Sequence, residues 1–254
     1  MDTNEPEFTK NLFTVNFPLL VPIGVTNPES GQMRMQLILA TRNANKTREI
    51  EEILGPGVVV RDLTAYPDIP EIPEIGNSFE ENAKLKAIAV SRNLSGLVIA
   101  DDSGLEVESL GGAPGIHSAR YAGENASDKE KIAKLLNRLA KMNAKSDQRR
   151  ARFCCVLAAA RDGQVLATFD GIVHGKIADQ PRGLHGFGYD PVFVPTGFKQ
   201  TFAELPPEVK NSISHRAKAI RKLQTELPAL CAGLYGLGGG GGGGGAPAGG
   251  APAG

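Results

Sequence analysis

Two adjacent carboxylates, Asp101 and Asp102, follow a short apolar run and precede a Ser-Gly pair. The run, residues 97–100, is typical of a buried strand, so we expect the pair at a strand end, with a turn after it. Neighbouring carboxylates there repel each other and lose hydration, and they persist best where a cation or a proton-transfer step uses them. Alternatively, both only shape the turn by bonding their own backbone. This stretch alone does not decide between the two.

A third carboxylate, Glu74, stands just before Gly76, where the chain can turn sharply into a helix over residues 78–93. Ser78 with a glutamate three residues later predicts a capping box at its start. Asn82 and Lys86 are four residues apart and share one face of that helix. Together with the aspartate pair, Glu74 supplies hard oxygen ligands of the kind that suits Mg²⁺.

Residues 37–46 predict a buried strand that enters a polar turn and then a helix. Such a junction presents free backbone N–H groups and the positive end of the helix dipole, which suits a phosphate. Thr41, Asn43 and Lys46 add a hydroxyl, an amide and an ammonium. The plainer interpretation is N-capping by Asn43 or Asn45 beside a solvated lysine. The glycine-rich Walker pattern is absent, so this is not a P-loop.

A glycine-rich stretch, residues 183–191, alternates glycines with Phe187 and Tyr189. It predicts a tight loop whose backbone approaches a flat ligand, with an exposed aromatic ring on which a base can stack. The alternative is a glycine-rich hairpin with Phe187 in the core.

The last helix, residues 214–227 before Pro228, opens with His215 and Arg216 and follows Lys210 closely. Cations at a helix N-terminus oppose the dipole, so an anionic or acceptor-rich ligand would account for them. Alternatively they are solvated, at a cost of only tenths of a kcal/mol. Together the four segments fit a nucleoside triphosphate with Mg²⁺.

The elements that must position these residues are apolar strands interleaved with amphipathic helices. This order predicts an α/β fold with a central mixed sheet and flanking helices. The expected strands are residues 35–40, 57–61, 97–100, 152–160, 164–169 and 191–194, and the expected helices are residues 45–54, 78–93, 128–142 and 214–227.

The composition limits the partners. Residues 1–34 and 235–254 lack a pattern that could build a core, so both are expected to be disordered, which leaves residues 35–234 as one domain. The 28 basic and 28 acidic residues balance, which argues against a nucleic-acid partner. No segment predicts a signal peptide or a membrane span. The three cysteines make no disulfide framework and indicate a reducing, cytoplasmic location.

Six ordered motifs make the chain resemble the inosine triphosphate pyrophosphatase family, the dITP/XTP pyrophosphatases. They are residues 41–46, 76–83, 100–105, 111–121, 186–191 and 214–216. The resemblance implies two lobes around a nucleotide cleft, usually in a homodimer, and cleavage of ITP, dITP or XTP to the nucleoside monophosphate and pyrophosphate. Arg42 stands where many relatives carry glycine, and its side chain is expected to point outward.

The resemblance also implies roles for single residues. Asp102 would be the general base and a metal-linked carboxylate, with Glu74 and Asp101 helping to hold Mg²⁺. The expected substrate contacts are Thr41, Arg42, Asn43, Lys46, Lys86, Ser103, Phe187, Gly188, Tyr189, Asp190, Lys210, His215 and Arg216.

Other functions stay open at this point. One is a related pyrophosphatase acting on methylated or pyrimidine triphosphates, although residues 186–191 and 214–216 speak against it. Another is a nucleotide sensor that no longer turns over, although the three intact carboxylates argue against loss of chemistry. A scaffolding role that uses the glycine-rich tail is the weakest.

Overall fold

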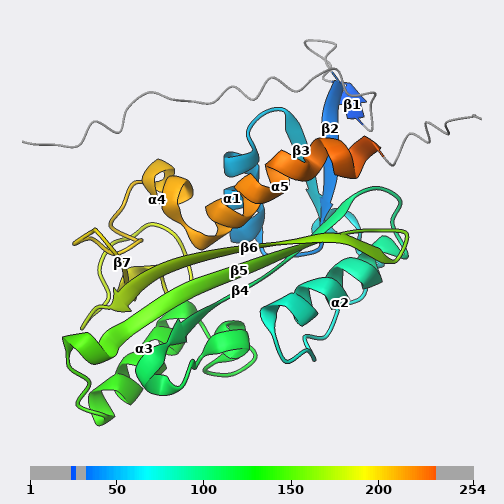
Figure 1. Ribbon diagram of the computed structural model, residues 1–254. Helices are drawn as coiled ribbons and strands as arrows, with labels where there is room; N and C mark the ends of the chain where they lie inside the picture. The colour runs from blue at the N-terminus through cyan, green and yellow to red at the C-terminus, as the bar shows by residue number, and fades with distance from the viewer. Residues whose placement is uncertain (1–23, 27–32, 233–254) are drawn as a thin grey trace, which may run out of the picture.

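The computed structural model describes residues 24–26 and 33–232 (Figure 1). A mixed seven-stranded sheet runs in the order β1-β2-β4-β5-β6-β7, and β3 pairs with β2. The strands are β1 (Gly24–Thr26), β2 (Met33–Leu39), β3 (Val58–Asp62), β4 (Val98–Val107), β5 (Arg150–Arg161), β6 (Gln164–Ile177) and β7 (Phe193–Pro195). The α-helices are α1 (Ala44–Leu54), α2 (Phe79–Ser91), α3 (Asp128–Lys141), α4 (Pro207–Ile213) and α5 (His215–Ala232). The expected α/β class with a central mixed sheet is confirmed.

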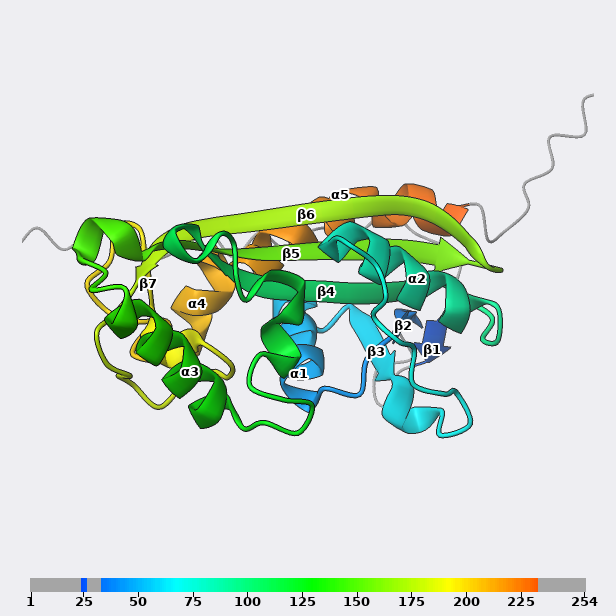
Figure 2. The ribbon, with the colours of Figure 1, turned by 90° about the horizontal axis from the view of Figure 1, so that it is seen from below.

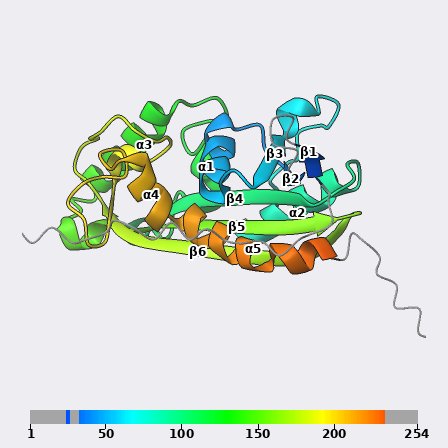
Figure 3. The ribbon, with the colours of Figure 1, turned by 90° about the horizontal axis from the view of Figure 1, so that it is seen from above.

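Helices cover both faces of the long strands β4, β5 and β6. Helix α5 lies along one face, with α1 and α4 on the same side, as the view from above shows (Figure 3). Helices α2 and α3 lie on the opposite side, as the view from below shows (Figure 2). No helix of the described ranges has the length and apolar composition needed to cross a bilayer.

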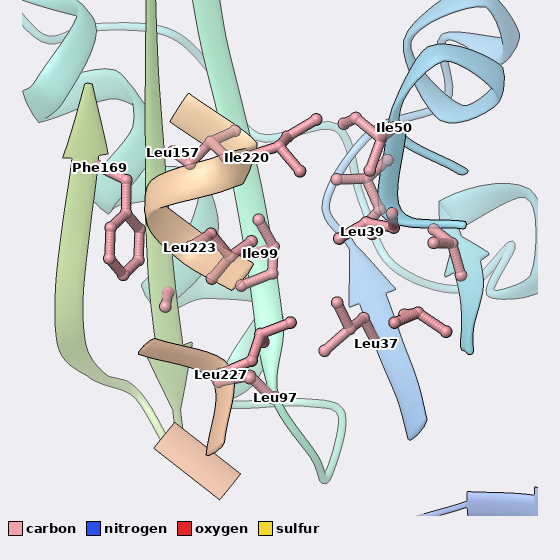
Figure 4. Packing of buried hydrophobic residues seen from close by; sticks show 14 of the residues in the cluster. Leu37, Leu39, Ile50, Leu97, Ile99, Leu157, Phe169, Ile220, Leu223 and Leu227 are labelled. Atoms are coloured by element: carbon pink, nitrogen blue, oxygen red, sulfur yellow. The ribbon is translucent and has the colours of Figure 1, made fainter. Parts of the chain in front are cut away.

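The two faces are packed differently. Between the sheet, α1 and α5, large aliphatic side chains such as Leu39, Ile99 and Leu223 fill the interior (Figure 4). On the α2 side the contact is made largely of small residues, with Ala83 and Ala87 of the helix against alanines of β4 and β5. Small side chains let a helix approach a sheet closely, so the polar residues of α2 come near the backbone of β4.

Strand β4 is longer than expected, and this changes the site. It pairs with β5 in an unbroken antiparallel ladder from Val98↔Ala160 to Val107↔Ala151. The expected turn after residue 102 is therefore wrong. Strand β4 also pairs with β2, in parallel, but only at Ile38↔Val98 and Leu39↔Ile99. Beyond Ile99, the edge of β4 that faces β2 has no strand beside it among the described residues, and the polar turn after β2 lies there.

Other boundaries also differ from expectation. Helix α5 continues past Pro228 because Leu227 and Cys231 on either side of it are buried in the core, and tertiary packing outweighs the lost hydrogen bond. Strand β1 falls in the segment 1–34 that the sequence predicts to be disordered, and it pairs with the start of β2. The rest of that segment up to residue 32, and the tail 235–254, lie outside the described residues.

Candidate active site

Asp101 and Asp102 point to opposite faces of the sheet. They are consecutive residues in the middle of β4, and successive side chains of a strand alternate between its faces. Both are buried, with 1% and 4% of their surfaces exposed. Asp101 faces α1 and α5, whereas Asp102 faces α2. The two carboxylates therefore have separate sets of partners, and neither shapes a turn.

On the α2 side, Lys86 joins the two carboxylates of Asp102 and Glu74. Its Nζ donates to Asp102 Oδ1 at 2.8 Å, to Glu74 Oε1 at 3.0 Å and to the main-chain oxygen of Asp101 at 2.9 Å. The second oxygen of Asp102, Oδ2, is buried and has no hydrogen-bond partner within the described ranges. A buried acceptor without a donor is costly in free energy, so this atom marks a place for a ligand or an ion.

The segment that carries Glu74 is tied to the start of α2. The amide oxygen Oδ1 of Asn82 accepts a hydrogen bond from the N–H of Gly76 at 2.8 Å. A Cβ on Gly76 would lie 2.7 Å from the Cβ of Glu81, so the approach requires glycine. The hydroxyl of Ser78 caps the helix as expected, but Glu81 accepts from the N–H of Asn77 and not from that of Ser78.

The pKa values of Asp102 and Glu74 shift in opposite directions, although both carboxyls are largely buried. For Asp102, burial and the negative charge of Glu74 outweigh the opposing effect of Lys86 and raise the pKa to about 6. For Glu74, burial also acts to raise the pKa, but Lys86 and then Arg120 outweigh it and lower the value. Asp102 thus exchanges a proton near neutral pH, while Glu74 stays ionised.

On the other face, Asp101 is fully paired. Its carboxylate accepts from Arg216 Nε at 3.0 Å, from the ammonium of Lys46, and from the hydroxyl of Ser103 at 2.8 and 2.9 Å. Burial would raise its pKa, but Arg216 and Lys46 outweigh that effect and hold it well below the ordinary value. Asp101 is a permanent anion that fixes the starts of α1 and α5 to the sheet.

A buried glutamate that sequence reasoning missed, Glu49 of α1, completes this face. Its carboxylate pairs with both Lys210 and Arg216, and Lys210 also pairs with Asp190 at 2.5 Å. Burial would raise the pKa of Glu49, but Arg216 and Lys210 outweigh it and lower the value. Lys210 of α4 and Arg216 at the start of α5 are thus balanced within the protein. One signal in the sequence is that Glu49 follows Lys46 by three residues, on the same helix face.

The ring of Phe187, half-buried, lies over the two cations, 5.1 Å from the Nζ of Lys210 and 5.6 Å from the guanidinium carbon of Arg216. The main-chain N–H of Phe187 donates to Asp190 Oδ2 at 2.9 Å. The next residue, Gly188, has a φ of +61° and donates its N–H to Asp128 of α3 at 2.6 Å. The expected glycine-rich loop is present, and Phe187 is its partly exposed ring.

Tyr189 and His215 are buried and occupy structural positions. The hydroxyl of Tyr189 donates to the main-chain oxygen of Ser118 at 3.0 Å. The ring of His215 stacks on Phe153, with centroids 4.7 Å apart and planes at 8°. Burial, with Arg216 and Lys210 nearby, holds the pKa of His215 well below its ordinary value, so it is neutral. Its Nδ1 is buried and has no hydrogen-bond partner in the described part of the chain.

The polar turn after β2 adopts the expected strand-to-helix conformation. Asn43 caps α1, because its Oδ1 accepts from the N–H groups of Asn45 at 3.0 Å and Lys46 at 3.3 Å. The hydroxyl of Thr41 accepts from the N–H of Asn43 at 3.2 Å. The guanidinium of Arg42 donates to the main-chain carbonyl of Ile69, in the segment after β3. Lys46 extends from this turn to Asp101, where its Nζ also lies 3.4 Å from the main-chain oxygen.

The three carboxylates expected to help hold Mg²⁺ do not form a single group. Within residues 24–26 and 33–232, no cluster of three or more His, Cys, Asp or Glu side chains is arranged around a common point. Asp101 is separated because it faces the other side of β4 and is bound by Arg216 and Lys46. Glu74 and Asp102 remain together, and two carboxylates plus substrate oxygens are a usual set for Mg²⁺.

Comparison with known proteins agrees with this architecture. A sequence model of the Ham1 family matches residues 37–226. The chain is 50% identical over 199 residues to the dITP/XTP pyrophosphatase of Geobacillus kaustophilus (strain HTA426), covering 78% of this chain and 97% of that protein. It is 47% identical over 195 residues to the enzyme of the same name from Bacillus subtilis (strain 168), covering 76% and 98%.

Two solved structures are also similar. The HAM1 protein from Coxiella burnetii superposes with a TM-score of 0.68 at 39% identity, covering 76% of this chain and 98% of that one. The Staphylococcus aureus Ham1 protein superposes with a TM-score of 0.67 at 43% identity, covering 77% and 99%.

Proposed function

Since this chain belongs to the Ham1 family, we propose that it hydrolyses the non-standard purine nucleoside triphosphates ITP, dITP and XTP to the nucleoside monophosphate and pyrophosphate. The membership confirms the resemblance inferred from the six motifs. The substrate class is supported by relatives at 50% and 47% identity that are named dITP/XTP pyrophosphatases. The site must then hold a polyphosphate, aim a water molecule at it and recognise a 6-oxo purine.

The observation that carries this proposal is the meeting of two ammonium groups at one main-chain oxygen. Lys46 comes from α1 and Lys86 from α2, on opposite faces of the sheet, and their Nζ atoms lie 3.4 and 2.9 Å from the oxygen of Asp101. This point is on the part of β4 beyond its pairing with β2, beside the phosphate-type turn. Two cations and a helix N-terminus at one sheet edge provide the positive charge that a triphosphate needs.

Asp102 is suited to be the general base. Its pKa of about 6 lies close to neutral pH, where a carboxylate both accepts a proton readily and is largely ionised. Its buried Oδ2, without a hydrogen-bond partner among the described residues, is free to bind a water. In this mechanism Asp102 orients the attacking water and takes its proton, while Lys46 and Lys86 balance the charge of the phosphates.

Glu74 and Asp102 fit a divalent cation. Both offer hard carboxylate oxygens, and both already contact one positive charge in Lys86. We therefore assign Mg²⁺ to this pair and exclude the carboxylate of Asp101 from it. When bound, Mg²⁺ would neutralise phosphate charge and lower the pKa of a bound water.

Base recognition is assigned to the Asp101 face. Phe187 offers a ring for stacking, which contributes about 1–3 kcal/mol per base. The ammonium of Lys210 has three donors, and Glu49 and Asp190 take two of them, so one can serve the 6-oxo group of hypoxanthine or xanthine. Adenine has an amino donor at that position, and an unpaired buried donor would oppose ATP by several kcal/mol.

A substrate panel tests this function. We expect kcat/KM for ITP and XTP to exceed that for ATP by at least about 100-fold, with inosine monophosphate and pyrophosphate as the products of ITP. Release of orthophosphate, or equal rates with ATP, would overturn the proposal.

We also propose that the protein is a homodimer in the cytoplasm, without nucleic-acid or membrane partners. Light scattering on the purified protein tests the dimer.

A further inference from the structure

One of the six motifs, residues 111–121, has no role in the mechanism above. Its second half forms the 3₁₀ helix η3 (Gly115–Arg120), which lies against β4 on the side of α2 and α3 (Figure 2). The hydroxyl of Ser118 accepts the N–H of Leu105 in β4 at 2.9 Å. A Cβ on Gly104 would lie 2.5 Å from that hydroxyl, so η3 is seated directly on the strand backbone. The motif is therefore a well-anchored element beside the site.

The last residue of η3, Arg120, reaches back across 46 residues of sequence to Glu74. Its Nη1 donates to Glu74 Oε2 at 2.8 Å, and its Nη2 donates to the main-chain oxygen of Glu74 at 3.2 Å. The other carboxylate oxygen, Oε1, is held by Lys86 at 3.0 Å. One guanidinium thus binds both the side chain and the backbone of the same residue.

Glu74 needs such support because it precedes the part of its segment that is tied to α2, at Gly76 and Asn77. It lies between η1 (Leu63–Ala65) and α2, outside any helix or strand, and the neighbouring Ile75 is 75% exposed. A carboxylate on a segment of this kind would have many orientations. The conformational entropy lost when a cation fixes one of them would weaken cation binding. Arg120 connects Glu74 to η3, and η3 is fixed to the sheet.

We propose that Arg120 is a positioning residue, which holds the Glu74 carboxylate beside Asp102 in the orientation that binds the divalent cation. The inference rests on the proposed function. The planar guanidinium presents two donors in a fixed geometry, and an ammonium cannot reproduce that geometry. Residues that orient a metal ligand typically change metal affinity or activity by 10- to 100-fold when replaced.

The variant Arg120→Lys separates positioning from charge. It keeps the positive charge near the cation site, so repulsion of the cation is unchanged, but it loses the two-point contact with Glu74. The matched control is Arg138→Lys. Arg138 of α3 donates to the hydroxyl of Tyr121, the residue after Arg120, at 2.8 Å, and it has no hydrogen bond to Glu74 among the described residues. Thermal melts of both variants report on folding.

Two quantities are measured. The first is the dissociation constant of Mn²⁺ for the full chain without nucleotide, determined by electron paramagnetic resonance, and the second is the Mg²⁺ concentration for half-maximal ITP hydrolysis. We expect Arg120→Lys to raise both about tenfold at an unchanged melting temperature, and Arg138→Lys to leave both at the parental value.

Parental Mn²⁺ affinity and Mg²⁺ dependence in Arg120→Lys would overturn the inference, and so would an equal loss in Arg138→Lys. Failure of the proposed function is distinguished because it shows in the parent protein. A parent that neither binds Mn²⁺ nor hydrolyses ITP removes both proposals, whereas an active parent with an unaffected Arg120→Lys removes only this one.

Discussion

The neighbouring aspartates on the two faces of β4 differ in their hydrogen-bond partners and in the direction in which their pKa values shift. On one face, Asp101 is held by Arg216, Lys46 and Ser103, and its pKa is far below the ordinary value. On the other face, Asp102 keeps one oxygen without a donor among the described residues, and its pKa is raised to about 6. A carboxylate that is fully paired stabilises a fold, whereas one that is buried and partly unpaired is available for chemistry.

The surrounding charges explain the difference. On the Asp101 face, buried carboxylates from β4, α1 and the glycine-rich loop meet two buried cations from α4 and α5, so charges are paired on every side. On the Asp102 face, Asp102 and Glu74 share Lys86, and Glu74 is partly exposed. The protein thus keeps its rigid ion network and its reactive carboxylate on opposite sides of one strand.

Replacement of the reactive carboxylate should have the largest effect. Asp102→Asn keeps the shape and an acceptor for Lys86 but cannot take a proton, so we expect kcat for ITP to fall by about 10³-fold. Urea unfolding of the same variant should stay within about 1 kcal/mol of the parent. Turnover near the parental rate would remove Asp102 from the role of general base.

The paired carboxylate should show the reverse pattern. Asp101→Asn removes the buried negative charge that Arg216 and Lys46 share, and only Glu49 remains beside Arg216. We expect the free energy of unfolding to drop by about 3–5 kcal/mol. The Mg²⁺ concentration for half-maximal activity should not change in the protein that remains folded. A raised Mg²⁺ requirement at parental stability would return Asp101 to the metal-binding group and break the contrast between the faces.

Phe187→Ala examines whether the Asp101 face also binds the base. Removing the ring takes away stacking worth about 1–3 kcal/mol, so KM for ITP should rise about 10- to 100-fold. The value of kcat should change far less, because the phosphate end of the site is untouched. A fall in kcat at constant KM would contradict this assignment of the base.

The smallest expected effect is on the pH dependence of stability. His215 is neutral in the folded protein because its pKa is held well below the ordinary 6.5, and the unfolded chain takes up a proton below that pH. The contribution of His215 to stability should therefore fall as pH drops below about 6.5, by an amount on the order of 1 kcal/mol by pH 5. His215→Phe should remove this part of the slope in urea titrations at pH 5 and 7.5, and an unchanged slope would exclude His215 as its source.

Much of the site could be predicted from residue types because its chemistry is local. The polar turn after β2, the start of α2 and the glycine-rich loop all lie where the sequence predicts them, and Asn43 and Ser78 cap helices as expected. Glu49 was missed by the same reasoning, because its place three residues after Lys46 does not show that it is buried. It sits among charged residues in α1 like an ordinary surface glutamate, and only the docking of α4 and α5 buries it against two cations.

The sequence by itself determined most of the elements and their order, and which side chains carry charge at their ends, but it did not predict β1 or the short helix α4. Only the tertiary structure decided which of these charges meet. The ten-residue strand β4 extends through Asp101 and Asp102 because it pairs with β5, about fifty residues later, and a pairing between distant segments leaves no local signal. Once the strand continues, the two-residue alternation of side chains sends the neighbouring aspartates to opposite faces, and burial with different partners sets their different pKa values.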